Sequence, residues 1–320
     1  MPGATAMLPK AIAALKSYPA VPVVLLLLAL FSAASPYFAT AGNIEAMLGA
    51  NAVVLIAAVG MTFVFLIGGI DLSISTVISA SAVLAGIVMA QTGSIPLGVL
   101  TAVAVGAGFG LLNGVLIGYF KLTPFITTMA TQLIARGLAF VMSEGIAVKG
   151  TPYGLLDFGF LLWFGLPAVM VVALAIAGGG AVVLGHSTWG RHVMLTGSNP
   201  SAARYAGLNV ARIECEVYLL SGVLAGVAGF VSIANLGNAI PGVGDTLLLI
   251  IIGAVVLGGT SMTGGEGSIG RTVLGVALLA VLTSGLNLMG IPFYDQLIIQ
   301  GVLIFLGTWV AMKLSGRRAL

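Results

Sequence analysis

Charged residues are scarce in this chain. Only 7% of its 320 residues are Asp, Glu, Lys or Arg, whereas 59% are apolar, and the mean hydropathy is +1.19. Soluble domains carry about 25% charged residues, so this sequence has too few polar side chains to cover a water-soluble core. Its apolar runs are long enough to cross a bilayer as helices, and the alternation that marks the strands of a membrane barrel is missing. The composition predicts an all-α, polytopic membrane protein.

Cysteine is almost absent, and so are the residue patterns of most enzymes. Cys215 stands alone, so no disulfide framework can form. No group of His, Cys, Asp and Glu has metal-ligand spacing, and no predicted span carries a Ser–His, His–Glu or paired-Asp constellation. No lysine follows a glycine, so the Walker A phosphate loop is missing and the chain is expected to hydrolyse no ATP itself. The basic residues are dispersed among loops, which argues against nucleic acid as a partner.

Apolar runs recur along the whole chain and predict about ten transmembrane helices. We expect these at positions 21–38, 51–67, 74–90, 96–120, 124–142, 161–184, 217–236, 246–257, 272–289 and 296–312. If the amino terminus is inside, Lys149 falls outside, Arg136 lies within the fifth span, and the other basic residues fall on the cytoplasmic side. These are Lys10, Lys16, Lys121, Arg191, Arg204, Arg212, Arg271, Lys313, Arg317 and Arg318. The distribution follows the positive-inside rule and predicts that both termini are cytoplasmic.

Two blocks of predicted spans have similar lengths, spans two to five and spans seven to ten. They start from opposite sides of the membrane. That geometry allows two inverted halves with a pathway at their interface. Because no repeat is visible at the level of single residues, the inverted halves are a hypothesis.

Glycine pairs interrupt the apolar runs at membrane depth, at 68–69 and within 258–265. Non-helical backbone at that depth is tolerated only inside protein or beside a cavity. Asp71 follows the first break and is the one acidic residue near the middle of the first half. An intramembrane carboxylate indicates a functional site, and a cap on the following helix is an equally good interpretation.

The fifth predicted span carries a polar stripe. Thr128, Thr131 and Gln132 share a helix face by their spacing, and Arg136 continues it. This stripe is the best candidate for the lining of a polar pathway, and hydrogen bonding between helices is the alternative. Asn113 and Asn235 are single amides in other spans, for which bonding between helices is the better interpretation from the residues alone.

A polar segment at 191–212 separates the two apolar parts of the chain and contains a short helix with both end signals. Asn199 is expected to cap it, Pro200 to occupy its first position, and Gly207 to end it in the left-handed conformation. We expect an exposed tip from Ala202 to Tyr205. These signals alone favour an ordinary surface helix over a helix that a partner protein binds and moves.

Several stretches together resemble the permease subunits of ribose-type sugar importers of the ATP-binding cassette class. They are GGIDLSISTVISASAVLAG, PFITTMATQLIARGLAF, SNPSAARYAGLNVAR, AVVLGGTSMTGGEGSIGRTVLG and NLMGIPFYDQL. The resemblance runs in order from about 51 to 313. The segment 244–252 is more apolar than this family leads one to expect, and Glu266 stands where a basic or neutral residue is expected.

The resemblance implies a single permease domain, 1–320, in the bacterial cytoplasmic (inner) membrane, with a cytoplasmic coupling loop at 186–212. It implies a second permease, an extracytoplasmic solute-binding protein, and a cytoplasmic ATPase that binds ATP and Mg²⁺, while this chain binds no cofactor or metal. The residues expected to couple to the ATPase are Asn199, Pro200, Ser201, Ala202, Ala203, Arg204, Tyr205 and Gly207. Those expected to line the substrate pathway are Asp71, Ser73, Asn113, Phe125, Thr128, Thr131, Gln132 and Asn235.

A monosaccharide, either a pentose or a hexose, is the expected solute, because a pathway of Thr, Asn, Gln and Ser offers hydrogen bonds without a counter-charge. Another small polar solute, such as an autoinducer-like furanose or a nucleoside, is an alternative. A secondary transporter working alone is a further alternative, but it would need several intramembrane acidic residues for ion coupling.

Overall fold

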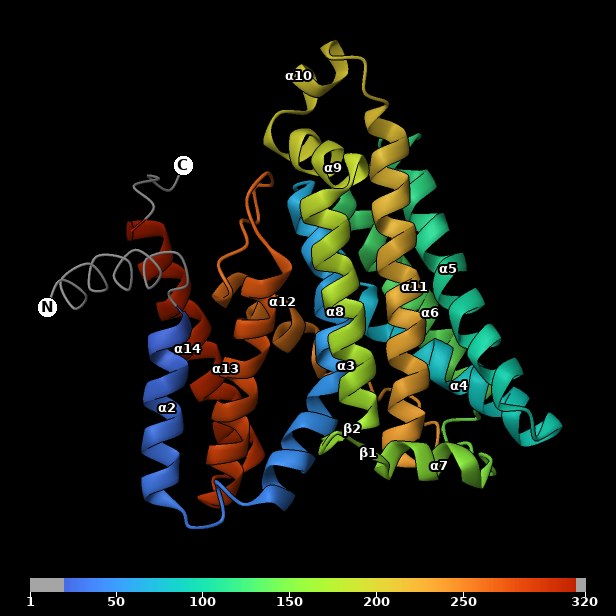
Figure 1. Cartoon of the computed structure of the whole chain (residues 1–320). Helices are drawn as coiled ribbons and strands as arrows, with labels where there is room; N and C mark the ends of the chain where they lie inside the picture. The colour runs from blue at the N-terminus through green and yellow to red at the C-terminus, as the bar shows by residue number, and fades with distance from the viewer. Residues whose placement is uncertain (1–19, 315–320) are drawn as a thin grey trace, which may run out of the picture.

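The computed structural model of the chain describes residues 20–314, most of them in α-helices. In chain order the elements are α2 (Ala20–Ala34), α3 (Ala41–Leu66), α4 (Ile74–Thr92), α5 (Ile95–Gly118), α6 (Pro124–Met142), α7 (Tyr153–Phe160), β1 (Leu162–Trp163), β2 (Leu166–Pro167), α8 (Ala168–His186), α9 (Thr188–Ser198), α10 (Pro200–Tyr205), α11 (Val210–Leu236), α12 (Leu247–Leu257), α13 (Ile269–Leu288) and α14 (Phe293–Leu314). Figure 1 shows α9 and α10 at one end of the molecule, here the α10 end, and α7 with the β-hairpin at the opposite, α7 end. The basic residues predicted near the two chain termini, at 10, 16, 317 and 318, lie outside the described residues.

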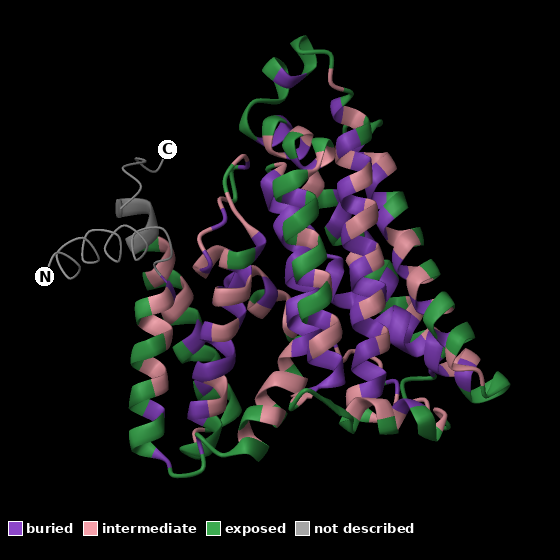
Figure 2. Cartoon of the chain, in the orientation of Figure 1, coloured by how far each residue is buried: buried purple, intermediate pink, exposed green. Residues whose placement is uncertain are grey.

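Among residues 20–314, seven helices are long and apolar enough to cross a membrane, namely α3, α4, α5, α6, α8, α11 and α13. Three shorter apolar helices, α2, α12 and the described part of α14, lie at the remaining positions where spans are predicted. The predicted all-α, polytopic membrane fold is confirmed at this level. The buried residues gather where α3, α4 and α11 meet, and outward faces of the surrounding helices are exposed (Figure 2).

Two helices begin earlier than their apolar runs indicate. α3 starts at Ala41, where the Thr40 hydroxyl accepts a hydrogen bond from the Asn43 N–H at 3.4 Å. α11 starts at Val210, where Asn209 accepts from the Arg212 N–H at 3.0 Å. Both caps lie in polar sequence outside the apolar runs, so hydropathy alone placed the helix starts too late.

The predicted span at 161–184 is corrected at its start. Residues 162–167 form a small antiparallel hairpin, in which Leu162 pairs with Pro167 and Trp163 with Leu166. The turn places Phe164 and Gly165 at φ 56° and 78°, a left-handed conformation that a right-handed helix cannot contain. α8 therefore begins only at Ala168.

A glycine stripe lets α5 and α11 pack with their backbones in contact. Gly106, Gly110, Gly114 and Gly118 recur every fourth residue on α5, so they share one face. A Cβ atom at Gly110 would lie 2.5 Å from the Tyr218 carbonyl oxygen, and one at Gly114 would lie 2.6 Å from the Cys215 carbonyl oxygen. Such small-residue faces drive helix packing in membranes, where no hydrophobic force draws helices together.

The contacts between helices are paired in a way that relates α3–α6 to α11–α14. α11 packs against α4 and α5, and α3 packs correspondingly against α12 and α13. α4 contacts α5 and α6, as α12 contacts α13 and α14. α3 and α11 themselves pack together and run in opposite directions (Figure 1). This correspondence has the form expected of two inverted halves.

Candidate functional site

The chain breaks its helical path between α3 and α4. Gly68 takes φ 73°, and a Cβ atom at Gly69 would lie 2.5 Å from the Tyr218 hydroxyl. That hydroxyl donates a 3.1 Å hydrogen bond to the Ile70 carbonyl oxygen. The break is therefore held against α11, in agreement with the rule that irregular backbone at membrane depth is enclosed by protein.

Asp71 lies in this break and is 2% exposed. Its Oδ1 accepts hydrogen bonds from the Ser73 N–H at 3.1 Å and the Ser73 hydroxyl at 2.6 Å. Its Oδ2 accepts from the Ser221 hydroxyl on α11 at 2.8 Å. The carboxylate thus orders the backbone just before α4 and joins the break to α11, whereas the N-cap position of α4 belongs to Ser73, whose side chain makes no capping bond.

The hydrogen bonds continue from Ser73 to α6. The Asn113 amide on α5 donates to the Ser73 hydroxyl at 2.9 Å, and the Thr131 hydroxyl on α6 donates to the Asn113 carbonyl oxygen at 2.8 Å. We call Ser221, Asp71, Ser73, Asn113 and Thr131 the buried polar chain, because none is more than 2% exposed. In this conformation these side chains bond helix to helix and face no open passage.

Ser221 was not predicted as a functional residue, whereas the other four members of the buried polar chain were predicted as pathway residues. A lone serine in an apolar helix carries no signal of its partner. Its proximity to Asp71 follows only from the antiparallel packing of α11 beside the break. A polar side chain on the helix face that packs against a glycine break is the signal that would have found it.

The predicted polar stripe on α6 is only partly buried. Thr128 is buried and donates to the Pro124 carbonyl oxygen at 2.9 Å. Gln132 is half-buried, and Phe125 and Arg136 are exposed. The expectation that Thr128, Thr131 and Gln132 all line one surface is corrected, because the packing of α6 on α4 and α5 covers the threonine side and leaves the flank with Gln132 and Arg136 open.

Arg136 forms an ion pair with an aspartate that the sequence analysis did not single out. Its Nη2 atom lies 3.0 Å from Oδ2 of Asp245, in the loop between α11 and α12. The neighbouring Gly244 N–H donates to the Ser79 hydroxyl on α4 at 2.9 Å. Asp71 and Asp245 thus occupy corresponding places, each shortly before the helix that follows a break, and each bonds to the other half of the chain.

Asn235 lies apart from the buried polar chain, near the α7 end of α11. Its amide donates to the Gly49 carbonyl oxygen on α3 at 2.9 Å. It also borders a cavity of about 390 Å³ together with Glu45 and Phe160. The interpretation of Asn235 as a bond between helices is confirmed for this conformation.

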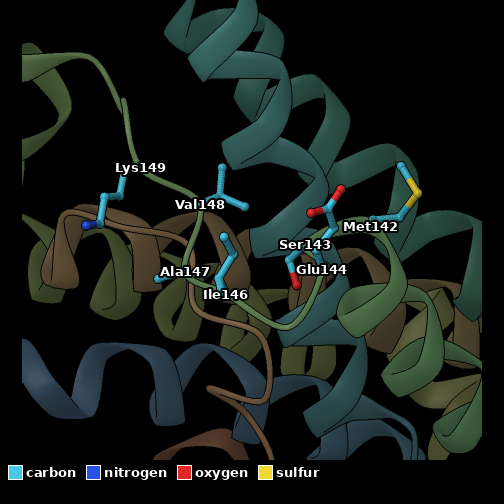
Figure 3. Close-up of a pocket in the computed structure, with 7 residues that line it drawn as sticks. All are labelled: Met142, Ser143, Glu144, Ile146, Ala147, Val148 and Lys149. Atoms are coloured by element: carbon cyan, nitrogen blue, oxygen red, sulfur yellow. The ribbon is translucent and has the colours of Figure 1, made fainter.

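A larger cavity, of about 680 Å³, opens in the loop after α6 at the α7 end. Figure 3 shows Glu144 and Lys149 at opposite sides of it, with Ile146 and Val148 between them. The loop is tied to the second half, because Val148 and Ala239 exchange backbone hydrogen bonds at 2.9 and 3.1 Å. The cavity therefore lies at a junction of the two halves.

The short helix predicted in the polar segment is confirmed as α10. The Asn199 side chain accepts from the Ala202 N–H at 2.9 Å, Pro200 is the first helical residue, and Gly207 takes φ 85°. Tyr205 is 94% exposed, and Ser201, Ala202 and Arg204 are exposed as well. The expected exposure of Ala203 is wrong: it is 5% exposed because that face of α10 packs on its own protein.

α9 connects α10 to the end of α3. A Cβ atom at Gly197 would overlap the Leu66 carbonyl oxygen, and the same oxygen accepts a 2.9 Å hydrogen bond from the Gly265 N–H. Gly197, Leu66 and Gly265 therefore form a close backbone junction between α9, the first half and the second half. A displacement of α9 would act directly on the start of the break that contains Asp71.

The described residues contain no group of three or more His, Cys, Asp and Glu side chains that could hold a metal ion. The site thus consists of neutral hydroxyls and amides, the buried Asp71 and one ion pair between the halves. On the open flank of α6, the Gln132 amide and the Arg136–Asp245 pair can donate hydrogen bonds to a neutral polar solute and accept them from it.

Comparison with known proteins gives consistent matches over most of the chain. The family model described as "branched-chain amino acid transport system / permease component" matches residues 43–307. The ribose import permease protein of Escherichia coli K12 is 36% identical over 296 residues, which are 90% of this chain and 91% of that protein. The ribose import permease protein of Bacillus subtilis is 36% identical with 91% of each chain covered. The L-arabinose transport system permease protein of E. coli K12 is 34% identical over 84% of this chain and 82% of the relative. No solved structure matches the chain.

Proposed function

The chain belongs to the permease-component family whose model it matches, and we propose that it is the membrane subunit of an ATP-binding cassette importer that moves a monosaccharide, a pentose or a hexose, into the cell. The observation that carries the proposal is similarity along nearly the whole chain to permeases named for ribose and L-arabinose, joined by one named for D-allose at 32% identity. A neutral polyol also suits the hydroxyl and amide side chains of the site.

The proposed topology has about ten membrane crossings, two inverted halves, and both termini in the cytoplasm of a bacterium, with the protein in the cytoplasmic membrane. The paired helix contacts support the inverted halves. Lys121 lies at the α10 end, where its amino group pairs with Glu214 at 2.8 Å, and Arg204 lies on α10 itself. Lys149 lies in the loop at the α7 end. The α10 end is therefore the cytoplasmic face in this proposal.

The proposed partners are those of an importer complex. A cytoplasmic ATPase would bind ATP and Mg²⁺ and contact the coupling loop at 186–212, chiefly through Ser201, Ala202, Arg204 and Tyr205. A second permease, identical or related, would complete the membrane unit, and an extracytoplasmic solute-binding protein would dock at the α7 end. The chain would otherwise contact lipid and bind neither nucleic acid nor a cofactor of its own.

The coupling path follows from the backbone junction beneath α10. When the ATPase closes on ATP, its motion would displace α10 and α9 together, because the buried Ala203 fastens α10 to the protein. Gly197 on α9 touches the Leu66 carbonyl group at the end of α3. The displacement would therefore reach the break and the start of α4, which Asp71 holds.

The solute pathway is proposed to follow the open flank of α6, past Phe125 and Gln132. Behind this flank the buried polar chain, with Asp71, Ser73, Asn113 and Thr131, would brace α4 and hold its position. Thr128, whose hydroxyl bonds within α6, would only pack behind the flank, and Asn235 would lie near the outer mouth.

A permease for another small polar solute, such as an autoinducer-like furanose or a nucleoside, is the alternative nearest to this proposal. A secondary transporter is less well supported, because Asp71 is the only buried acidic residue among the described residues. Ion-coupled transporters use several intramembrane carboxylates.

Identification of the retained solute tests the proposal. The permease would be purified from cells with its ATPase and its binding protein, without added solute, and the small molecules released on denaturation would be identified by mass spectrometry. A pentose or hexose is expected. A nucleoside or a furanose of the autoinducer type would replace the proposed solute class, while retention of the ATPase in the complex would still support the importer.

A further inference from the structure

Arg136 is an exposed charge on a membrane helix. It lies six residues before the end of α6 at Met142, roughly 9 Å along the helix axis. Its side chain is 56% exposed in this protomer. A guanidinium at such a depth is costly in lipid and is found facing protein or a water-filled cavity. This flank of α6 therefore faces an aqueous passage or another protein surface.

The partner of Arg136 has unused hydrogen-bonding capacity. Oδ2 of Asp245 pairs with Arg136 at 3.0 Å, but Oδ1 is buried and has no hydrogen-bond partner in the described part of the chain. Buried carboxylate oxygens are rarely left without a donor. Gly244, next to Asp245, is fixed on α4 by its bond to Ser79. The carboxylate is thus held in place, with Oδ1 enclosed by protein and part of the side chain exposed.

An aromatic ring and an amide flank the ion pair. The Arg136 guanidinium lies 5.9 Å from the centre of the Phe140 ring, and that ring is 37% exposed. Gln132 lies one turn before Arg136 on the same flank, by the i, i+4 spacing that also relates Arg136 to Phe140. The cavity in the loop after α6 begins at Met142, two residues beyond Phe140. A solute that entered there would meet these side chains next.

We propose that Arg136, Asp245, Phe140 and Gln132 form a monosaccharide-binding subsite in the outer part of the pathway. A sugar hydroxyl can donate to the Asp245 carboxylate, whose side chain is 25% exposed, and accept from the Arg136 guanidinium. The Phe140 ring offers an apolar face to the C–H side of the sugar. The pair as a whole is neutral, which suits an uncharged solute. The subsite rests on the proposed function, since it names where that solute binds.

The competing interpretation is a structural tie, meaning an ion pair that only stabilises the packing of the two halves. The pair joins α6 in the first half to the loop before α12 in the second. The chain offers a matched control for that role. Lys121 and Glu214 also form an ion pair between the halves, at 2.8 Å, but at the α10 end. Glu214→Gln removes that tie without touching the proposed subsite.

The test is sugar uptake per ATP hydrolysed, in vesicles that contain the whole complex with binding protein loaded with D-ribose, L-arabinose or D-allose. Asp245→Asn and Gln132→Met should lower uptake of the transported sugar about tenfold and threefold, while assembly and the ATPase activity stimulated by loaded binding protein stay near wild type. Glu214→Gln should leave uptake per ATP unchanged. The exchange Arg136→Asp with Asp245→Arg keeps an ion pair and should not restore uptake.

Recovery of uptake by the charge exchange would show that the pair is only a tie and would overturn the subsite. Equal effects of Asp245→Asn and Glu214→Gln would do the same, as would uptake unaffected by both Asp245→Asn and Gln132→Met. If the unsubstituted complex imports none of the three sugars, the proposed function is overturned and the subsite with it. These two failures are distinguished by the unsubstituted complex alone.

Discussion

The Asp71 carboxylate accepts a 2.8 Å hydrogen bond from the Ser221 hydroxyl, so the break before α4 is fastened to the middle of α11 by two fully buried side chains. Through Ser73 the same carboxylate continues to Asn113 and Thr131. One acidic residue therefore orients the start of α4, which the proposed coupling path reaches through the break, and connects it to α5, α6 and α11.

Replacing Asp71 should separate its bonding role from its charge. Asp71→Leu leaves the Ser73 and Ser221 hydroxyls without an acceptor and should cost about 1–3 kcal/mol for each unpaired group. Asp71→Asn keeps an acceptor for the Ser73 N–H and should lose much less stability. Thermal unfolding of the detergent-solubilised permease measures the difference. An Asp71→Leu protein with the wild-type Tm and full transport would refute the bracing role.

The glycine stripe on α5 predicts a position-specific packing defect. Gly110→Ala places a Cβ atom against the Tyr218 carbonyl oxygen and should destabilise the α5–α11 pair by about 1–3 kcal/mol. Gly108→Ala on the same helix is the control, because nothing lies within 4 Å of a Cβ atom there. The readout is the Tm and the yield of monodisperse protein. Equal behaviour of the two variants would contradict the close approach of the helices.

Two exposed tyrosines test the orientation. With Cys215 replaced by alanine, cysteines at Tyr153 and Tyr205 stand at opposite ends of the molecule, at sites 85% and 94% exposed. An impermeant thiol reagent added to intact cells should label the cysteine at 153 and spare that at 205. After permeabilisation both should react. Labelling of 205 in intact cells would invert the proposed topology.

If α10 couples the permease to the ATPase, as proposed, substitutions on it should have graded effects. Tyr205→Ala and Arg204→Glu alter the exposed face of α10 and should reduce ATPase binding while the permease keeps its Tm. Asn199→Ala removes the cap and should cost about 1 kcal/mol of helix stability with a milder loss of coupling. Ala203→Glu should instead dislodge α10 from its own protein, because Ala203 is buried. Co-elution with the ATPase at wild-type yield in the Tyr205 and Arg204 variants would exclude this face as the contact.

Local signals in the sequence predicted the parts of the structure that depend on neighbouring residues. The Asn199 cap, Pro200 at the first helical position and the left-handed Gly207 follow from residues within one helix, and the break at Gly68 follows from the glycines themselves. Contacts between segments that are distant in the sequence could not be predicted from these local signals. Ser221 meets Asp71, and Arg136 meets Asp245, only because the two halves pack antiparallel. The burial of Ala203 and Thr128 likewise depends on which neighbouring helix covers each face, a property that helical spacing does not contain.

ATP-dependent sugar uptake is the most direct test of whether this chain is the permease of a sugar importer. The permease, its ATPase and its binding protein would be placed in proteoliposomes with ATP and Mg²⁺ inside, and entry of labelled D-ribose, L-arabinose and D-allose would be followed. We expect at least one of these sugars to accumulate. Accumulation should be abolished when the phosphate-binding lysine of the partner ATPase is replaced, and proton or sodium ionophores should leave it unchanged. Accumulation that persists without the ATPase and collapses with an ionophore would contradict this expectation and identify a secondary transporter.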